Sequence, residues 1–121
     1  MPPASAVVLV VEDEPLQRMM AADLVERAGF EVVEAGSADE AVRILENRLD
    51  IRVVFTDIDM PGGVDGMKLA ASIRERWPPI ELIIISGKHR PSPEDLPMRG
   101  VFFSKPYKRD EVTAAMRRFL S

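Results

Sequence analysis

The stretch Val7-Val8-Leu9-Val10-Val11-Glu12-Asp13 determines how the rest of the chain is interpreted, because an unbroken apolar run ends in two acids. A short run of this kind, rich in β-branched residues, predicts a strand that is covered on both faces. Further short apolar segments of the same kind follow at residues 31–35, 53–56, 82–85 and 101–103. Together with residues 6–11, they give five expected strands.

Segments with helical spacing separate these strands. In the first, Leu16, Met19, Met20, Leu24 and Ala28 recur at intervals of three and four residues, so we expect them to face the core. The next residue is a glycine, which is typical of a position just past the end of a helix. The seven methionines of the chain are thereby interpreted mainly as core fillers.

Three more helices are expected. The sequence Ser37-Ala38-Asp39-Glu40 has the pattern of a capping box and opens the second of them. The third is expected to stop at Trp77, because two prolines follow. The residues expected to face the core are Ala41, Ile44, Leu45 and Leu49 in the second helix, Met67, Ala70 and Ile73 in the third, and Val112, Ala115, Met116 and Phe119 in the last.

The alternation of strands and helices predicts an α/β fold, a doubly wound parallel sheet with helices on both faces. Residues 87–100 interrupt this alternation, because Pro93 and Pro97 leave room for one helical turn at most. The expected organisation is one domain over residues 1–121, with a core at about 6–120 and no output domain after it.

Composition excludes several classes of protein. The chain has 121 residues and no cysteine, so disulfide frameworks and thiolate chemistry are excluded. No apolar run reaches the roughly 18 residues of a membrane span, and the start of the chain lacks a basic secretion signal. The net charge of −4 argues against direct binding of nucleic acid or anionic membranes. A cytoplasmic protein is therefore expected.

Polar residues follow the expected strands at one end of each. Glu12 and Asp13 follow the first strand, Asp57 the third, Ser86 the fourth and Lys105 the fifth. The carboxyl ends of parallel strands meet at one edge of the sheet, which is where ligands bind in such folds. Carboxylates without histidine or cysteine favour Mg²⁺ over zinc or copper. A lysine and a hydroxyl beside them suit phosphate, and Asp57 could act as a carboxylate nucleophile.

In this arrangement the chain resembles the receiver domains of bacterial two-component response regulators, specifically the single-domain type. The stretches that carry the resemblance are Val10-Val11-Glu12-Asp13-Glu14-Pro15, Asp57-Ile58-Asp59-Met60-Pro61 with Asp65-Gly66, Ile85-Ser86-Gly87, and Lys105-Pro106-Tyr107. They occur in the order of the family and cover nearly the whole chain.

The resemblance implies a sheet ordered 2-1-3-4-5 and a phosphoryl acceptor at Asp57. It implies Mg²⁺ ligands at Asp13, Asp57 and the backbone carbonyl of Asp59, with Glu12 acting through water. It further implies phosphoryl contacts from Ser86 and Lys105, a switch formed by Ser86 and Phe102, and a cis peptide bond before Pro106. Phe102 lacks the hydroxyl that such a switch can use, which leaves a steric role.

The sequence departs from the family in two places. The loop at residues 60–66 is one residue longer than the commonest receiver spacing, and residues 87–100 replace the usual fourth helix by a short or irregular one. The output mechanism of the family is therefore not carried over. His89 lies in the second of these stretches, and no chemistry is assigned to it.

The function implied by the resemblance is phosphoryl acceptance from a histidine kinase or a histidine phosphotransfer protein. Phosphorylation would change binding to an unidentified downstream protein, or self-association into a homodimer. Such a domain is not an enzyme, apart from slow self-phosphorylation by small phosphodonors and slow self-dephosphorylation. Two alternatives stay open: a haloacid-dehalogenase-like phosphohydrolase that uses Asp57 and Asp59, and a degenerate receiver that acts as a constitutive scaffold.

Overall fold

A computed structural model of the chain describes residues 6–59, 66–88, 94, 96 and 99–120. The strands are β1 (Val7–Val11), β2 (Glu31–Ala35), β3 (Ile51–Asp57), β4 (Glu81–Ser86) and β5 (Gly100–Ser104). The helices in this part of the chain are α1 (Pro15–Arg27), α2 (Ala38–Asn47), α3 (Gly66–Arg76) and α4 (Arg109–Leu120).

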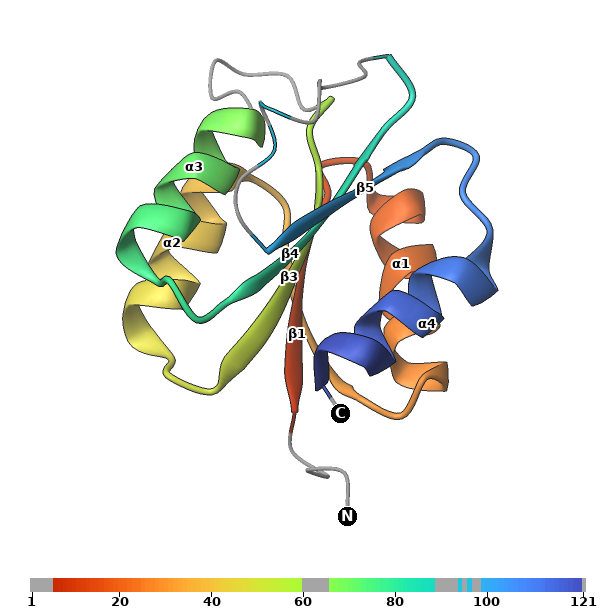
Figure 1. Ribbon diagram of the computed structural model, residues 1–121, viewed down its shortest axis with the longest axis horizontal. Helices are drawn as coiled ribbons and strands as arrows, with labels where there is room; N and C mark the ends of the chain where they lie inside the picture. Colours follow the sequence, from red (N-terminus) through yellow and green to blue (C-terminus); the bar gives the residue numbers. More distant parts are fainter. Residues whose placement is uncertain (1–5, 60–65, 89–93, 95, 97–98, 121) are drawn as a thin grey trace.

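The five strands form one parallel sheet in the order β2-β1-β3-β4-β5. Helices α2 and α3 cover one face of the sheet, and α1 and α4 cover the other (Figure 1). The doubly wound fold and the strand order expected from the sequence are thus confirmed. The expected short helix between β4 and β5 falls mostly on residues 89–93, 95 and 97–98, which lie outside the described residues, as does His89.

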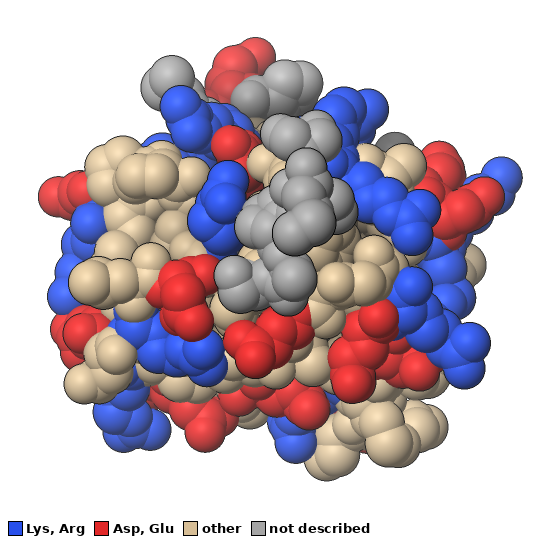
Figure 2. All heavy atoms as spheres, turned by 90° about the horizontal axis from the view of Figure 1, so that it is seen from below, with Lys and Arg blue, Asp and Glu red and all other residues tan. Residues whose placement is uncertain are grey.

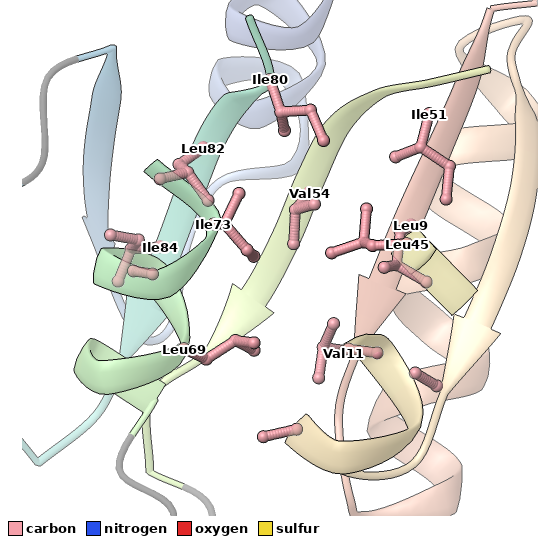
Figure 3. Packing of buried hydrophobic residues seen from close by; sticks show 14 of the residues in the cluster. Leu9, Val11, Leu45, Ile51, Val54, Leu69, Ile73, Ile80, Leu82 and Ile84 are labelled. Atoms are coloured by element: carbon pink, nitrogen blue, oxygen red, sulfur yellow. The ribbon is translucent and has the colours of Figure 1, made fainter. Parts of the chain in front are cut away.

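Two apolar layers explain why the strands are mainly apolar on both faces. Leu9, Val54 and Leu82 belong to the layer under α2 and α3, where Leu45 and Ile73 meet them (Figure 3). The neighbouring residues on each strand point the opposite way, toward α1 and α4, and they include Val8, Val10, Phe55 and Ile83. Because successive side chains alternate between faces, a sheet with two covered faces needs apolar residues at every position.

The buried face of α1 differs from the expected one. Leu16, Met19 and Met20 are 57%, 60% and 52% exposed, so their expected burial is wrong. The stripe that packs on the sheet begins with two alanines, and its buried residues are Ala21, Ala22, Leu24 and Val25. Small side chains let the helix approach the strands closely, and the large apolar residues of its first turns remain outside.

For α2, one expectation from the sequence is confirmed and another is wrong. The Ser37 hydroxyl accepts a hydrogen bond from the Glu40 N–H at 3.1 Å, which confirms the N-cap. The Glu40 side chain reaches back to the N–H of Gly36 at 2.5 Å, one residue earlier than the usual capping box. Leu49 was expected to be buried, but α2 ends at Asn47 and Leu49 is 99% exposed.

The molecular surface is mixed in charge. On the face at the amino ends of the strands, Lys and Arg side chains lie among Asp and Glu side chains, and no large patch of one sign stands out among the described atoms (Figure 2). In the described part of the chain, no helix combines the length and the apolar character that crossing a membrane requires.

Candidate functional site

The candidate site lies at the carboxyl ends of the strands, at the top of the molecule in Figure 1. The Asp57 carboxylate ends β3 and is only 3% exposed. Its Oδ2 accepts a hydrogen bond from Lys105 Nζ at 2.5 Å, and its Oδ1 accepts one from the Asp59 N–H at 2.8 Å. The end of β5 is held beside β4 by a hydrogen bond from the Lys105 N–H to the Ser86 carbonyl, 2.9 Å long.

Glu12 joins this cluster from the end of β1 and is 4% exposed. Burial raises the pKa of the Glu12 carboxyl, and the hydrogen bond and negative charge of Asp57 raise it further. The Glu14 N–H and the Lys105 ammonium oppose them, and the resulting pKa is about 8. Two buried acids therefore lie together near one ammonium group, which is bound to Asp57, and Glu12 favours its protonated form.

A Glu12→Gln variant is expected to be more stable than the native chain at alkaline pH when metal is removed with EDTA. The pKa of Glu12 rises from 4.5 to about 8 on folding, so the stability contributed by this group is complete below pH 4.5 and is lost as pH rises through about 8. At pH 8.5 the gain should be at least about 1.4 kcal/mol, the equivalent of one pKa unit. Urea unfolding at pH 5 and pH 8.5 measures it, and equal gains at both pH values would contradict it.

Groups other than Asp57 also act on the Lys105 ammonium group. Burial lowers the pKa of its ammonium group, but the hydrogen bond to Asp57 and the charges of Asp57, Glu12 and Asp59 outweigh burial and raise it overall. The ammonium group also donates to the Gln17 side chain on α1 at 3.1 Å. Gln17 was missed by the sequence reasoning, because nothing in its local pattern distinguishes it from any exposed helical residue.

Asp59 and Ser86 form a second pair beside the first. The Ser86 side chain is buried, and its hydroxyl donates to Asp59 Oδ1 at 2.6 Å. Asp59 Oδ2 accepts hydrogen bonds from the Gly87 and Lys88 N–H groups at 2.8 and 3.2 Å. Sequence reasoning placed both residues at the site, but the receiver interpretation gave Asp59 a role only through its backbone carbonyl.

The expected metal ligands are only partly gathered. Glu12 and Asp57 interact, while Asp13 is exposed on the loop that follows β1. Within the described residues, no group of three or more Asp, Glu or His side chains is arranged to hold a metal ion. The donor chemistry nevertheless fits a hard divalent cation, because every candidate ligand is an oxygen and the buried acids Glu12 and Asp57 interact directly.

A cavity of about 610 Å³ opens beside the cluster, between α1 and the segment after β5. Glu12, Asp57 and Lys105 form one part of its wall. Its apolar wall includes Leu16, Met20, Phe55, Pro106 and Tyr107. The Tyr107 ring packs edge-on against Phe55, with centroids 5.8 Å apart. The exposed residues Leu16 and Met20 of α1 therefore line a cavity that reaches the candidate site. Sequence reasoning expected them to face the core and did not place them at the site.

The last two predicted positions lie on β5 and just after it. Phe102 is half-buried against the core layer under α2 and α3, whereas Phe103 packs against the opposite layer. The peptide bond between Lys105 and Pro106 is cis, the isomer implied by the resemblance. The lengthened loop falls on residues 60–65, outside the described residues.

This fold, with acids and a lysine gathered at the carboxyl edge of the sheet, is that of a signalling domain of the receiver class, and comparison with known proteins identifies the family. Residues 8–117 match the response regulator receiver domain family. The chain therefore belongs to that family, whose fold is that of a signalling domain rather than an enzyme. The same comparison disfavours the haloacid-dehalogenase-like alternative.

Two crystal structures show the same fold. A response regulator receiver domain protein from Clostridium thermocellum is 30% identical, with a TM-score of 0.84 over 95% of this chain and 94% of that one. The receiver domain of the hybrid histidine kinase CckA is also 30% identical, with a TM-score of 0.79 over 95% of this chain and 99% of that one.

Curated relatives are longer than this chain. The sensor kinase CckA of Brucella abortus is 32% identical over 96% of this chain and 13% of the kinase. The aerobic respiration control protein ArcA of Escherichia coli is 31% identical over 94% of this chain and 48% of ArcA. The chain thus spans less than half the length of these relatives.

Proposed function

We propose that this receiver domain accepts a phosphoryl group on Asp57 from a phosphorylated histidine of a kinase or phosphotransfer protein, and that phosphorylation changes its binding to another protein or to a second copy. The observation that carries the proposal is the buried Asp57 carboxylate, held 2.5 Å from the Lys105 ammonium beside an open cavity. Such a domain is proposed to act in the cytoplasm, where ATP-dependent kinases work.

In the proposed reaction, a carboxylate oxygen of Asp57 attacks phosphorus, and the phosphorus–nitrogen bond of the donor histidine breaks. The imidazole nitrogen keeps the electron pair of that bond, and the product is an aspartyl phosphate. Lys105 lies where it can neutralise charge on the transferring oxygens. Ser86 is the proposed second donor to the phosphoryl group, and Phe102 is the proposed steric part of the switch.

Mg²⁺ is the proposed cofactor, with Asp13, Asp57 and the Asp59 carbonyl as ligands and Glu12 acting through water. When bound, the cation would supply neutralisation of phosphoryl charge. The chain's own contribution is to hold Glu12 and Asp57 buried side by side, and to keep Lys105 against them.

Mg²⁺ is expected to raise the melting temperature, because it binds the folded acids and not the unfolded chain. At a hundred times its dissociation constant, the gain in stability should be about 2.7 kcal/mol. Asp13→Ala should remove most of this gain, since the exposed carboxylate of Asp13 is a proposed ligand. Thermal unfolding with and without Mg²⁺ measures both. An undiminished gain in the variant would place the cation elsewhere.

The phosphodonor is proposed to dock on the exposed apolar residues of α1. Leu16, Met19 and Met20 are more than half exposed, and Leu16 and Met20 border the cavity that reaches Asp57. An unusual apolar surface beside a reactive group is typical of a protein-binding site. It would bring a donor histidine, presented on a partner helix, close to the acceptor.

Met20→Glu is expected to slow transfer from a phosphorylated histidine phosphotransfer domain by about tenfold or more, because a charge would be buried at the contact. Phosphorylation by acetyl phosphate, which needs no docking, should be unchanged. Leu49→Glu is the matched control, since Leu49 is exposed in the turn between α2 and β3 and does not line this cavity. Equal loss with both donors would assign Met20 to the site itself.

Phosphoryl uptake by the native protein tests the proposed function. The protein is incubated with acetyl phosphate and Mg²⁺, and its intact mass is measured, with EDTA in a parallel sample. The expected result is one added phosphoryl group per chain with Mg²⁺ and none with EDTA. Absence of the adduct under all conditions would contradict the proposal and favour the constitutive scaffold.

A further inference from the structure

The carboxylate of Asp59 is held by Ser86, the last residue of β4, and by the two residues that follow it. Its Oδ1 accepts the Ser86 hydroxyl proton at 2.6 Å, and its Oδ2 accepts from the N–H groups of Gly87 and Lys88 at 2.8 and 3.2 Å. The Ser86 oxygen also accepts from the Lys88 N–H at 3.1 Å. Successive donors that converge on one acid in this way form an anion-binding concavity.

This concavity lies directly beside the proposed phosphoryl acceptor. The Asp59 N–H donates to Asp57 Oδ1 at 2.8 Å, so the two acids are linked through the backbone. The Lys105 ammonium contacts Asp57, while the Ser86 hydroxyl faces Asp59 instead. In this structure, therefore, one of the two proposed phosphoryl ligands is at Asp57 and the other is bound to a neighbouring carboxylate.

We infer that Asp59 is an internal competitor of the phosphoryl group, a positioning residue that holds Ser86, Gly87 and Lys88 until Asp57 is phosphorylated. The inference rests on the proposed function. A serine hydroxyl has one proton to donate, and so does each backbone N–H. Ser86 therefore cannot donate both to Asp59 and to a phosphoryl oxygen, so the two arrangements exclude each other.

Phosphorylation would shift the balance between these arrangements. A phosphoryl group carries a charge of about −1.5 to −2 and three strong acceptor oxygens, so it attracts the same donors and repels the Asp59 carboxylate. The donors of Ser86, Gly87 and Lys88 then release the Asp59 carboxylate and bind the phosphoryl group instead. The strength of the Asp59 contacts sets how far the equilibrium lies toward the unphosphorylated arrangement, and hence how readily the segment responds.

The test uses beryllofluoride with Mg²⁺, a phosphoryl analogue that forms no stable covalent product, on the whole chain. Its affinity is measured for the native protein, Asp59→Asn, Ser86→Ala and the double variant. Because hydrogen bonds to a charged acceptor are about twice as strong as neutral ones, Asp59→Asn should bind the analogue about tenfold more tightly. In the Ser86→Ala background the same change should give less than about threefold.

This cycle separates competition for donors from simple charge removal. Loss of one negative charge would improve binding equally in both backgrounds, and that result would overturn the inference, as would unchanged or weaker binding in Asp59→Asn. A purely structural role predicts that affinity and thermal stability fall together. Competition predicts that Asp59→Asn lowers the melting temperature of the unliganded protein while raising affinity for the analogue.

Amide NMR supplies a direct readout of the donors. The Gly87 and Lys88 cross-peaks of the native protein should move when the analogue binds, and Asp59→Asn alone should move them too. Gly87 and Lys88 cross-peaks that stay in place in Asp59→Asn would overturn the inference. The proposed function is tested separately: a native chain without phosphoryl uptake refutes that proposal, whereas normal uptake with no effect of Asp59→Asn refutes only the competitor.

Discussion

Asp57→Asn is expected to abolish phosphoryl uptake entirely while leaving the fold intact. An amide has nearly the shape of the carboxylate but is not a nucleophile at its oxygen under these conditions. The amide oxygen of the variant can still accept from the Asp59 N–H or from Lys105, as the Asp57 carboxylate does at 2.8 and 2.5 Å. The residue at position 57 is buried, so shape is what preserves the packing around it.

Intact mass after incubation with acetyl phosphate and Mg²⁺ measures this loss. Asp50→Asn is the matched control: it removes an exposed carboxylate just before the amino end of β3, and we expect this variant to accept one phosphoryl group as the native chain does. Thermal unfolding of both variants confirms that they are folded. A phosphorylated Asp57→Asn chain at the native level would move the acceptor to another carboxylate and contradict the proposed function.

Gly66→Ala is expected to have the largest effect on stability. A Cβ at position 66 would lie 2.4 Å from the Ile58 Cα, and 2.9 Å from its Cβ and Cγ2. Ile58 follows the acceptor Asp57 directly, and Gly66 is buried at the start of α3. Because the closest atom belongs to the backbone, no side-chain rotation relieves the contact, and either α3 or the segment after β3 must move.

The expected loss is about 3 kcal/mol, at the upper end of the usual cost of overpacking, and it should lower the melting temperature by about 10 °C. Thermal and urea unfolding measure it. Gly87→Ala is the control, because the nearest atom to its added Cβ is 3.5 Å away, an ordinary contact. If the Gly66→Ala chain has the same melting temperature as the native protein, α3 can move away from Ile58 at little cost and the prediction is wrong.

The sheet could be predicted from the sequence because most buried positions of its strands are apolar. Continuous runs such as Val7–Val11 leave few alternatives, and the order of helices and strands then fixes a parallel arrangement. The face of α1 could not be predicted in this way. Hydrophobic spacing favours the large residues Leu16 and Met20, whereas packing against the sheet selected the small residues Ala21 and Ala22.

The meeting of Glu12, Asp57 and Lys105 followed from topology, since each lies at or directly after the carboxyl end of a strand at the same edge of the sheet. The contacts of individual side chains could not be predicted from topology. That Asp59 binds Ser86, rather than contributing only its carbonyl, depends on the path of the segment after β4. That Asp13 stays exposed depends on the loop before α1, and periodicity carries no information about loop paths.

Chemical identification of the phosphorylated side chain tests the central claim most directly. Borohydride reduction of the phosphorylated native chain converts an aspartyl phosphate to homoserine, which peptide mass mapping then locates. We expect homoserine at position 57 and unmodified aspartate at positions 13 and 59. Homoserine at either of those two positions, with Asp57 unchanged, would contradict the claim.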